Sequence, residues 1–340
     1  MPTRRAALAA AAAALFAPWP ARAQPADLAA AQREGALTWY TAHTDGETAQ
    51  LMVNGFMAEY SGIKATVIRT TAQVAYQRLL QDLKNGVAQC DVFSSTDLGH
   101  DEALRDDGKF ARYVPANAAG LRADLQGLDP SGTYYATLGE MVVPIHHTGR
   151  VRPEDVPRSW TDLLLPRWKN QVTVGHPAFS GTVGTWVVAM RKLYGPDYLA
   201  RLERNKPLIG RSVNDAVGTV TSGERIVGVG PVGLSQVTAA RGNPVGMVYP
   251  PDGAVLIVSP SAIMANAPHP NAARLFMEFL LSPAMSRLSN EARRVPVRAD
   301  APPQPGAVPF AEIKTLRLTT AEIVQDMQDA IEQWRDVFGA

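Results

Sequence analysis

The stretch QVTVGHPAFSGTVGTWVVAMR, residues 171–191, contains a strand and a helix joined by a tight turn. Its apolar opening, 172–174, predicts a short buried strand, and 175–177 (Gly-His-Pro) predicts the turn. Beyond Ser180, apolar side chains recur at the spacing of one buried helix face. Ser180 or Thr182 supplies the N-cap of this helix. A strand followed directly by a capped helix is the unit from which α/β folds are built.

The start of this helix is also a candidate anion site. Ser180, Gly181 and Thr182 leave several backbone N–H groups unpaired, and the helix dipole adds partial positive charge there. A capped helix after a tight turn explains the same three residues without any ligand, and for an isolated triplet that is the more frequent case. The remainder of the chain has to distinguish these interpretations.

The first 23 residues have the pattern of a signal peptide. A basic start containing Arg4-Arg5 precedes an almost purely apolar run, and Ala21-Arg22-Ala23 forms a cleavage site. The apolar run is shorter than the roughly 20 residues that span a bilayer. We therefore expect 1–23 to be removed and a periplasmic protein to begin near Gln24, exported by the Sec or the twin-arginine route.

Composition narrows the possible functions. The chain of 340 residues exceeds the size at which one core usually divides, which predicts two domains. The formal net charge of +1 gives no basic stripe for nucleic acid. Cys90 is the sole cysteine, so no intramolecular disulfide can form and packing must supply the stability.

The first third of the mature chain predicts a parallel α/β sheet. Strands are expected at 36–40, 65–68 and 90–93, with helices over 47–60, over 74–84 and from Leu98 onward. In such sheets, ligands bind at the carboxyl ends of the strands. Polar residues stand at all three ends: His43, Thr44, Arg69, Thr70, Thr71, Ser94, Ser95 and Thr96.

The later part of the chain is more mixed. The stretch 134–145 predicts two strands around Gly139. Apart from 172–174, further strands are expected at 225–229, 247–249, 254–258 and 261–264, and further helices at 197–204, 214–223, 271–281 and from Thr319 onward.

Several segments together resemble a known family. They are Leu37–Tyr40, Cys90–Phe93, Pro157–Trp168, Pro177–Thr182 and Asn271–Pro283. In this order and spacing, they resemble periplasmic solute-binding proteins of ABC importers, of the ferric-iron-binding type (extracellular solute-binding protein family 1). The resemblance covers nearly all of the mature chain.

The resemblance implies an α/β fold of two lobes, each a mixed sheet flanked by helices, with a ligand cleft between them. Strand crossings would lie near 141–144 and 247–250. The first lobe would comprise 24–140 and 250–283, and the second would comprise 141–249 and 284–340 with the C-terminal helices. The protein would be a monomer that delivers its solute to the transmembrane subunits of an ABC permease, without catalysis and without a cofactor.

The metal ligands of the iron-binding relatives are missing. Those proteins hold ferric ion with two adjacent tyrosines after the strand that corresponds to 225–229, where this chain reads Gly230-Pro231-Val232-Gly233. Ferric ion requires anionic oxygen ligands. The relatives also hold an anion on residues that correspond to 180–182 and Asn214, and these residues are present. We therefore expect a small organic anion, a carboxylate or a phosphonate or phosphate ester, and no bound metal.

The residues expected to bind this anion come from both lobes. They are His43, Thr44, Arg69, Thr70, Ser95, Thr96, Ser180, Gly181, Thr182, Asn214 and Tyr249. Arg69 is either a bidentate clamp on an oxyanion or an ordinary surface arginine.

Two alternatives remain at this point. One is a ferric-iron receptor with unusual ligands. The other is an exported NAD-binding enzyme that uses the run Gly228, Gly230 and Gly233, which matches a dinucleotide fingerprint after a strand. Pro231 opposes the second alternative because it removes a backbone donor where the pyrophosphate would need one.

Overall fold

A computed structural model describes residues 26–302, 304 and 306–339 of the chain. The predicted signal peptide, 1–23, lies outside the described residues. Within them, no helix combines the length and the apolar character needed to cross a bilayer.

The first set of strands is parallel, as predicted. Strand order is β2 (Lys64–Arg69), β1 (Ala36–Thr41), β3 (Val92–Ser94). The accompanying helices are α2 (Leu28–Glu34), α3 (Gly46–Glu59), α4 (Ala72–Lys84) and α5 (Leu98–Asp106). The third strand starts later than predicted. The preceding Asp91 is fully buried, and its carboxylate accepts hydrogen bonds from the backbone N–H groups of Thr38 and His269, each at 2.7 Å.

A second parallel set lies at the other end of the sheet. Its strand order is β7 (Val227–Pro231), β5 (Val172–Val174), β6 (Leu208–Ile209). Its helices are α6 (Gly181–Tyr194), α7 (Asp197–Glu203), α8 (Val213–Ser222) and α9 (Val232–Ala240). Residues 171–191 therefore form the predicted strand and helix, and Ser180 is the N-cap of α6.

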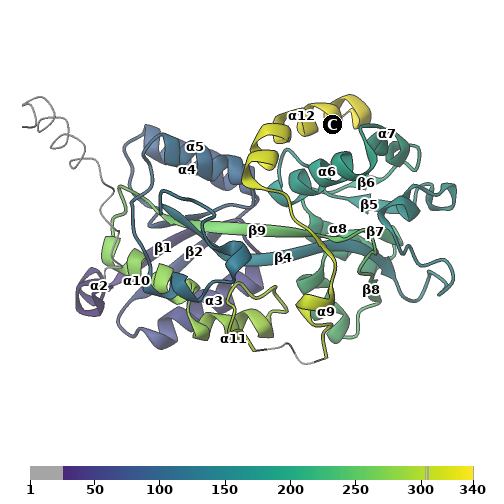
Figure 1. The fold of residues 1–340 in the computed structure, drawn as a ribbon. Helices are drawn as coiled ribbons and strands as arrows, with labels where there is room; N and C mark the ends of the chain where they lie inside the picture. Colours follow the sequence, from purple (N-terminus) through teal and green to yellow (C-terminus); the bar gives the residue numbers. More distant parts are fainter. Residues whose placement is uncertain (1–25, 303, 305, 340) are drawn as a thin grey trace, which may run out of the picture.

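Two long antiparallel strands, β4 (Tyr134–His147) and β9 (Ala254–Ile263), join the two sets. β9 pairs with β3 on one side, and β4 pairs with β7 on the other. Figure 1 shows β4 and β9 running side by side through the middle of the molecule. The predictions of two strands within 134–145 and of two strands within 254–264 are wrong, because β4 and β9 are each a single strand. Gly139 does not interrupt β4; a Cβ there would lie 3.0 Å from the Cβ of Val295, so the glycine permits the close approach of that segment. The short strands β8 (Val245–Met247) and β10 (Thr315–Leu316) pair with β4 and β9.

Each set of strands has its own aromatic core, and the fold has two lobes. In the first lobe, which holds β1–β3, the ring centroids of Trp39 and Phe276 are 5.3 Å apart, and both residues are fully buried. In the second lobe, which holds β5–β7, the rings of Trp160 and Trp186 lie 6.1 Å apart beside the buried Trp334. The predicted fold class is confirmed.

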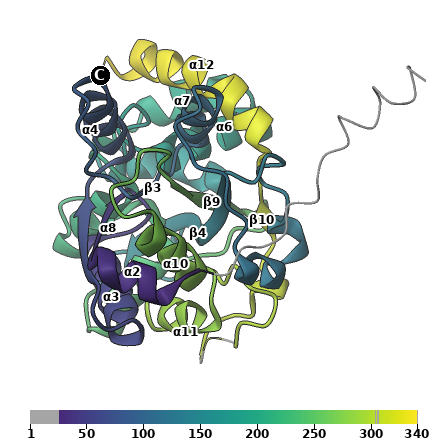
Figure 2. The same cartoon turned by 90° about the vertical axis from the view of Figure 1, so that its left-hand side faces the viewer.

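The C-terminal third contacts both lobes. Helix α10 (Pro270–Leu280) packs on α2, and α11 (Pro283–Glu291) packs on α3 and α10 in the first lobe. Helix α12 (Thr320–Phe338) contacts α6 and α7 and also α5, so it lies across both lobes (Figures 1 and 2). The contacts of α11 differ from the predicted assignment of 284–340 to the second lobe. The lobe boundaries at 140–141 and 249–250 stay a prediction.

Candidate functional site

A cavity lies between the two lobes, and we call it the cleft cavity. It is lined by the ends of β1 and β2, by residues of β4, β7 and β9, and by the starts of three helices. The free space within it is about 30 Å³. That is room for a few water molecules at most, so the two lobes are closely apposed.

Three helices begin at this cavity. Thr71, Ser180 and Ser212 are the N-cap residues of α4, α6 and α8, and all three line it. Each helix start carries partial positive charge and unpaired backbone N–H groups. One helix comes from the first lobe and two come from the second, so a ligand at this position would contact both lobes.

The hydroxyl groups of these caps differ in their bonding. Ser180 Oγ accepts a hydrogen bond from the backbone N–H of Val183 at 3.4 Å. Ser212 forms a capping box with Asp215. Thr71 Oγ1 is buried and has no hydrogen-bond partner among the described residues, although it is in the cap position of α4. An unpaired buried hydroxyl costs about 1–3 kcal/mol, which a ligand atom at this position would recover.

Arg69, at the end of β2, is the second notable donor. Its Nε donates a hydrogen bond to the carbonyl oxygen of Thr44 at 2.6 Å, which fixes the plane of the guanidinium. In the described part of the chain, its two terminal nitrogens have neither a hydrogen-bond nor an ion-pair partner. Burial lowers the pKa of Arg69 from its ordinary value. Two unpaired N–H₂ groups in one plane suit bidentate binding of an oxyanion.

A second arginine, Arg294, is held by carboxylates. Its Nη2 lies 2.5 Å from Asp45 Oδ2, and its Nη1 donates to Glu140 Oε2. Glu140 Oε1 also accepts from the backbone N–H groups of Met141 and Gly233, at 2.9 and 3.2 Å. Burial raises the pKa of Glu140, with Arg294 and these N–H groups opposing the rise. Burial likewise opposes ionisation of Asp45, but Arg294 and Thr48 bring its pKa below its ordinary value.

His43 is neutral at pH 7. Its Nε2 lies 2.7 Å from the carbonyl oxygen of Pro260, so Nε2 carries the proton and donates to that oxygen. Burial lowers its pKa to about 4, with Arg294 contributing in the same direction. His43 therefore connects the first loop to β9 by a neutral hydrogen bond.

Seven of the residues named from the sequence line the cleft cavity. They are His43, Thr44, Arg69, Thr96, Ser180, Thr182 and Asn214. Sequence reasoning missed Glu140, Arg294, Ser212 and Ser259 as lining residues. Ser212 carried a usable signal, because Ser212 and Asp215 have the spacing of a capping box. Glu140 and Arg294 carried none, because they meet only through packing.

The other four named residues do not line this cavity. Ser95 is fully buried and its Oγ bonds to His100 Nδ1 at 3.0 Å. Thr70 follows β2, and its backbone N–H donates a hydrogen bond to the carbonyl oxygen of Thr41. Tyr249 lies in a different pocket. Gly181 faces the opposite lobe directly: a Cβ there would lie 2.4 Å from backbone atoms of Thr96.

Direct contacts hold the lobes together around the cavity. The backbone N–H of Gln73 donates to the carbonyl oxygen of Phe179 at 3.4 Å. Outside the cavity, Arg241, which directly follows α9, pairs with Glu47 of α3, and its Nη1 lies 3.0 Å from Glu47 Oε2. This is the geometry of a closed cleft.

The geometry gives little support to a ferric-iron receptor or to an NAD-binding enzyme. Among the described residues that line the cleft cavity, Glu140 is the single carboxylate and none is a tyrosine. Gly228 and Gly230 lie inside β7 instead of in a turn, where a Cβ would lie 2.6 Å from Thr173 O or Ile145 Cδ1. These glycines therefore serve close strand packing, which corrects their interpretation as a phosphate-binding turn.

Comparison with known proteins identifies a family whose model matches this chain. The model of the bacterial extracellular solute-binding protein family matches residues 90–317. An uncharacterized protein of Haemophilus influenzae is 27% identical over 164 residues, which is 47% of this chain and 47% of that protein. The chain thus spans about half the length of the curated relative it matches.

Two solved structures show the same fold. The periplasmic binding protein AfuA from Actinobacillus pleuropneumoniae, with fructose-6-phosphate bound, gives a TM-score of 0.79 at 20% identity, covering 90% of this chain and 99% of that one. Iron-bound HitA from Pseudomonas aeruginosa gives a TM-score of 0.75 at 21% identity, covering 89% of this chain and 99% of that one. At this identity, the likeness concerns the fold alone.

Proposed function

The chain belongs to the family of bacterial extracellular solute-binding proteins, and from this premise we propose that it is the receptor of an ABC importer for a small organic anion. The solute is a carboxylate or a phosphonate or phosphate ester, bound between the lobes and delivered to the permease subunits from the periplasm. The protein acts as a monomer and catalyses no reaction.

One observation carries this proposal. The starts of α4, α6 and α8 meet at a cavity that also holds Arg69, whose terminal nitrogens have no partner in the described chain. Helix starts and an unpaired guanidinium all stabilise negative charge. Arg294 does not compete for this role, because Asp45 and Glu140 already balance its charge.

The same donor set disfavours a bare ferric ion. The carboxylate in the lining, Glu140, is bonded to Arg294, and the lining imidazole, His43, donates its Nε2 proton to Pro260. Among the described residues, no group of three or more His, Cys, Asp or Glu side chains could hold a metal ion. AfuA, which has a sugar phosphate bound, is therefore a closer guide to the solute than iron-bound HitA.

The test is calorimetric titration of the mature protein with organic carboxylates, phosphonates and phosphate esters, alongside ferric citrate. Arg69→Ala should weaken binding of the anion that binds best by about 1.5–3 kcal/mol, roughly 10- to 150-fold, because a charged hydrogen-bond donor is lost. Ser180→Ala should cost about 1 kcal/mol or less, because the backbone N–H groups at the same helix start remain.

An exposed arginine provides the control. Arg201→Ala, on the exposed side of α7, should leave affinity unchanged. The proposal fails if ferric ion binds tightly with no anion present, or if Arg69→Ala binds the anion as tightly as the wild type. A charge-transfer colour on adding ferric salt would support the iron alternative instead.

A further inference from the structure

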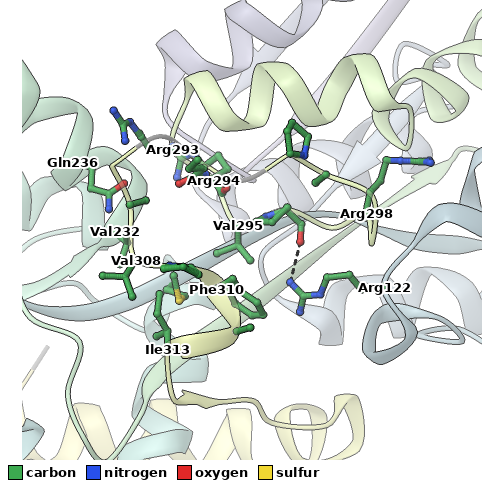
Figure 3. A pocket seen from close by; sticks show the side chains of 18 of the residues that line it. Arg122, Val232, Gln236, Arg293, Arg294, Val295, Arg298, Val308, Phe310 and Ile313 are labelled. Carbon is green, nitrogen blue, oxygen red and sulfur yellow. Dashed lines mark hydrogen bonds between the residues drawn. The ribbon is translucent and has the colours of Figure 1, made fainter.

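A second cavity, which we call the Gln236 pocket, lies apart from the cleft cavity. Its volume is about 360 Å³, within the range of small-molecule sites. Its walls come from β4, from α9, from Arg122 and Tyr249, and from described residues within 293–302, 304 and 307–313. Figure 3 shows Gln236 and Val232 on one side of it and Arg122 and Arg298 on the other. The two cavities share Arg294 alone among their lining residues.

The walls of this pocket are mainly apolar. Side chains that line it include Met141, Val232, Val295, Phe310 and Ile313. Such a surface gains free energy when an apolar ligand displaces water from it, at about 25 cal/mol per Å² removed from water. The cleft cavity, in contrast, is lined mostly by polar groups and helix starts.

Gln236 carries a polar atom that lacks a partner in the described part of the chain. Gln236 Oε1 is buried and makes no hydrogen bond among the described residues, while Gln236 Nε2 donates to Tyr249 Oη at 3.4 Å. A buried acceptor without a donor is costly, and Gln236 lines the pocket. The partner that satisfies it must bring an N–H or O–H group.

Three of the four arginines that line the pocket are paired with carboxylates. Arg122 pairs with Asp124 and lies 4.1 Å from the ring centroid of Phe310. Arg298 pairs with Asp300 through Nε at 2.7 Å. Arg294 is held by Asp45 and Glu140, as described above. With these three charges balanced inside the protein, the mainly apolar walls favour an uncharged ligand.

We propose that the Gln236 pocket is a second ligand site, which binds a small neutral molecule with an apolar body and one N–H or O–H donor directed at Gln236 Oε1. This site is separate from the anion site in position and in chemistry. Its occupancy does not depend on what the cleft cavity binds.

Acetanilide and N-methylacetanilide are a suitable pair of probes. Both have an apolar ring, but only acetanilide has an N–H donor. Two-dimensional ¹H–¹⁵N spectra of the mature chain would be followed during titration at millimolar concentration. Acetanilide should shift the signals of α9 and of residues 293–313. N-methylacetanilide should bind about five- to tenfold more weakly, because it leaves Gln236 Oε1 unpaired.

Two variants test the assignment. Gln236→Leu should remove the preference for acetanilide, so that both probes bind with similar affinity. Val308→Trp should block the pocket from a position that is 46% exposed, and should abolish binding of both without unfolding the protein. Matched controls are Gln81→Leu, on the exposed face of α4, and Val324→Trp, which is 42% exposed on α12; both should bind as the wild type does.

Three results would overturn the proposal. They are no binding of acetanilide to the wild type, equal affinity for the two probes in the wild type, and undiminished binding to Val308→Trp. None of them would affect the anion proposal, which the titrations with charged solutes test independently.

Discussion

At the scale of single residues, the cleft cavity contains groups that are already bonded and groups that are not. Arg294, Glu140 and His43 have partners within the protein. Arg69 and Thr71 retain unpaired donor atoms within the described chain. The bonded groups fix the shape of the site, and the unpaired groups are those that a solute would engage.

Thr71→Val should weaken anion binding by about 1 kcal/mol, roughly fivefold, with little change or a small gain in the free energy of unfolding. The reason is that Thr71 Oγ1 is buried without a partner, so the valine removes an unsatisfied group of similar shape. Calorimetry and urea unfolding would measure both effects. Thr66→Val, on the exposed side of β2, is the control. A loss of stability above about 1 kcal/mol without any loss of affinity would contradict this assignment.

The stability of the protein should depend on pH through His43. An unfolded histidine binds a proton below about pH 6.5, whereas folded His43 binds one only below about 4. Between these values the unfolded state holds more protons, so the free energy of unfolding falls as pH is lowered, by at most about 3 kcal/mol from this group.

Urea unfolding at several pH values would measure this dependence. His43→Gln keeps a donor for Pro260 but does not titrate, so its stability should change less between pH 6.5 and 4. If the free energy of unfolding changes with pH by the same amount in the wild type and in His43→Gln, His43 does not contribute to the pH dependence of stability.

At the scale of elements, the site depends on where helices begin. Each of α4, α6 and α8 follows its strand after a short connection, so the carboxyl ends of the strands and the starts of the helices meet at one edge of each parallel set. Helix α6 approaches the other lobe through Gly181.

Gly181→Ala should impair anion binding by tenfold or more, about 1.4 kcal/mol, without unfolding the protein. The added Cβ would lie 2.4 Å from the backbone of Thr96, and moving that backbone requires the lobes to separate. The control is Gly218→Ala in α8, where a Cβ meets nothing within 4 Å. This control should raise stability by about 0.5–1 kcal/mol and leave binding unchanged. Wild-type affinity in Gly181→Ala would show that the close approach is not needed for binding.

At the scale of the whole molecule, the described arrangement is a closed one. The cleft cavity leaves about 30 Å³, whereas ligand sites usually provide about 300 Å³ or more. A solute therefore has to enter while the lobes are apart. Because β4 and β9 are the long strands that join the lobes, bending there would open the cleft.

Solution scattering should show that the free protein is more extended than the protein with bound anion. The radius of gyration should fall when the anion is added, because the ligand stabilises the closed arrangement by its higher affinity for it. Gly181→Ala should show a smaller change at the same occupancy. If a saturating anion, verified by calorimetry, leaves the radius of gyration unchanged, the hinge mechanism is wrong.

Much of the fold was predictable from the sequence, because its signals are local. Hydrophobic periodicity and capping residues placed most helices and strands. A polar strand end placed Arg69 near the cleft, and a capped helix start placed Ser180 there. Where these signals misled, tertiary packing was responsible. Gly139 was expected to break β4, but it accommodates Val295.

The sequence by itself determined the α/β class, the family resemblance and the residues at the ends of the strands and the starts of the helices. Only the tertiary structure decided which of these residues share a cavity. Arg294 meets Asp45, 249 residues away in the chain, and Glu140, 154 residues away. The tertiary structure also places Tyr249 in a different pocket, away from the cleft cavity. The physical reason is that helices and strands form through hydrogen bonds and periodicity over a few residues, whereas a cavity forms where distant segments pack, and no local pattern encodes that packing.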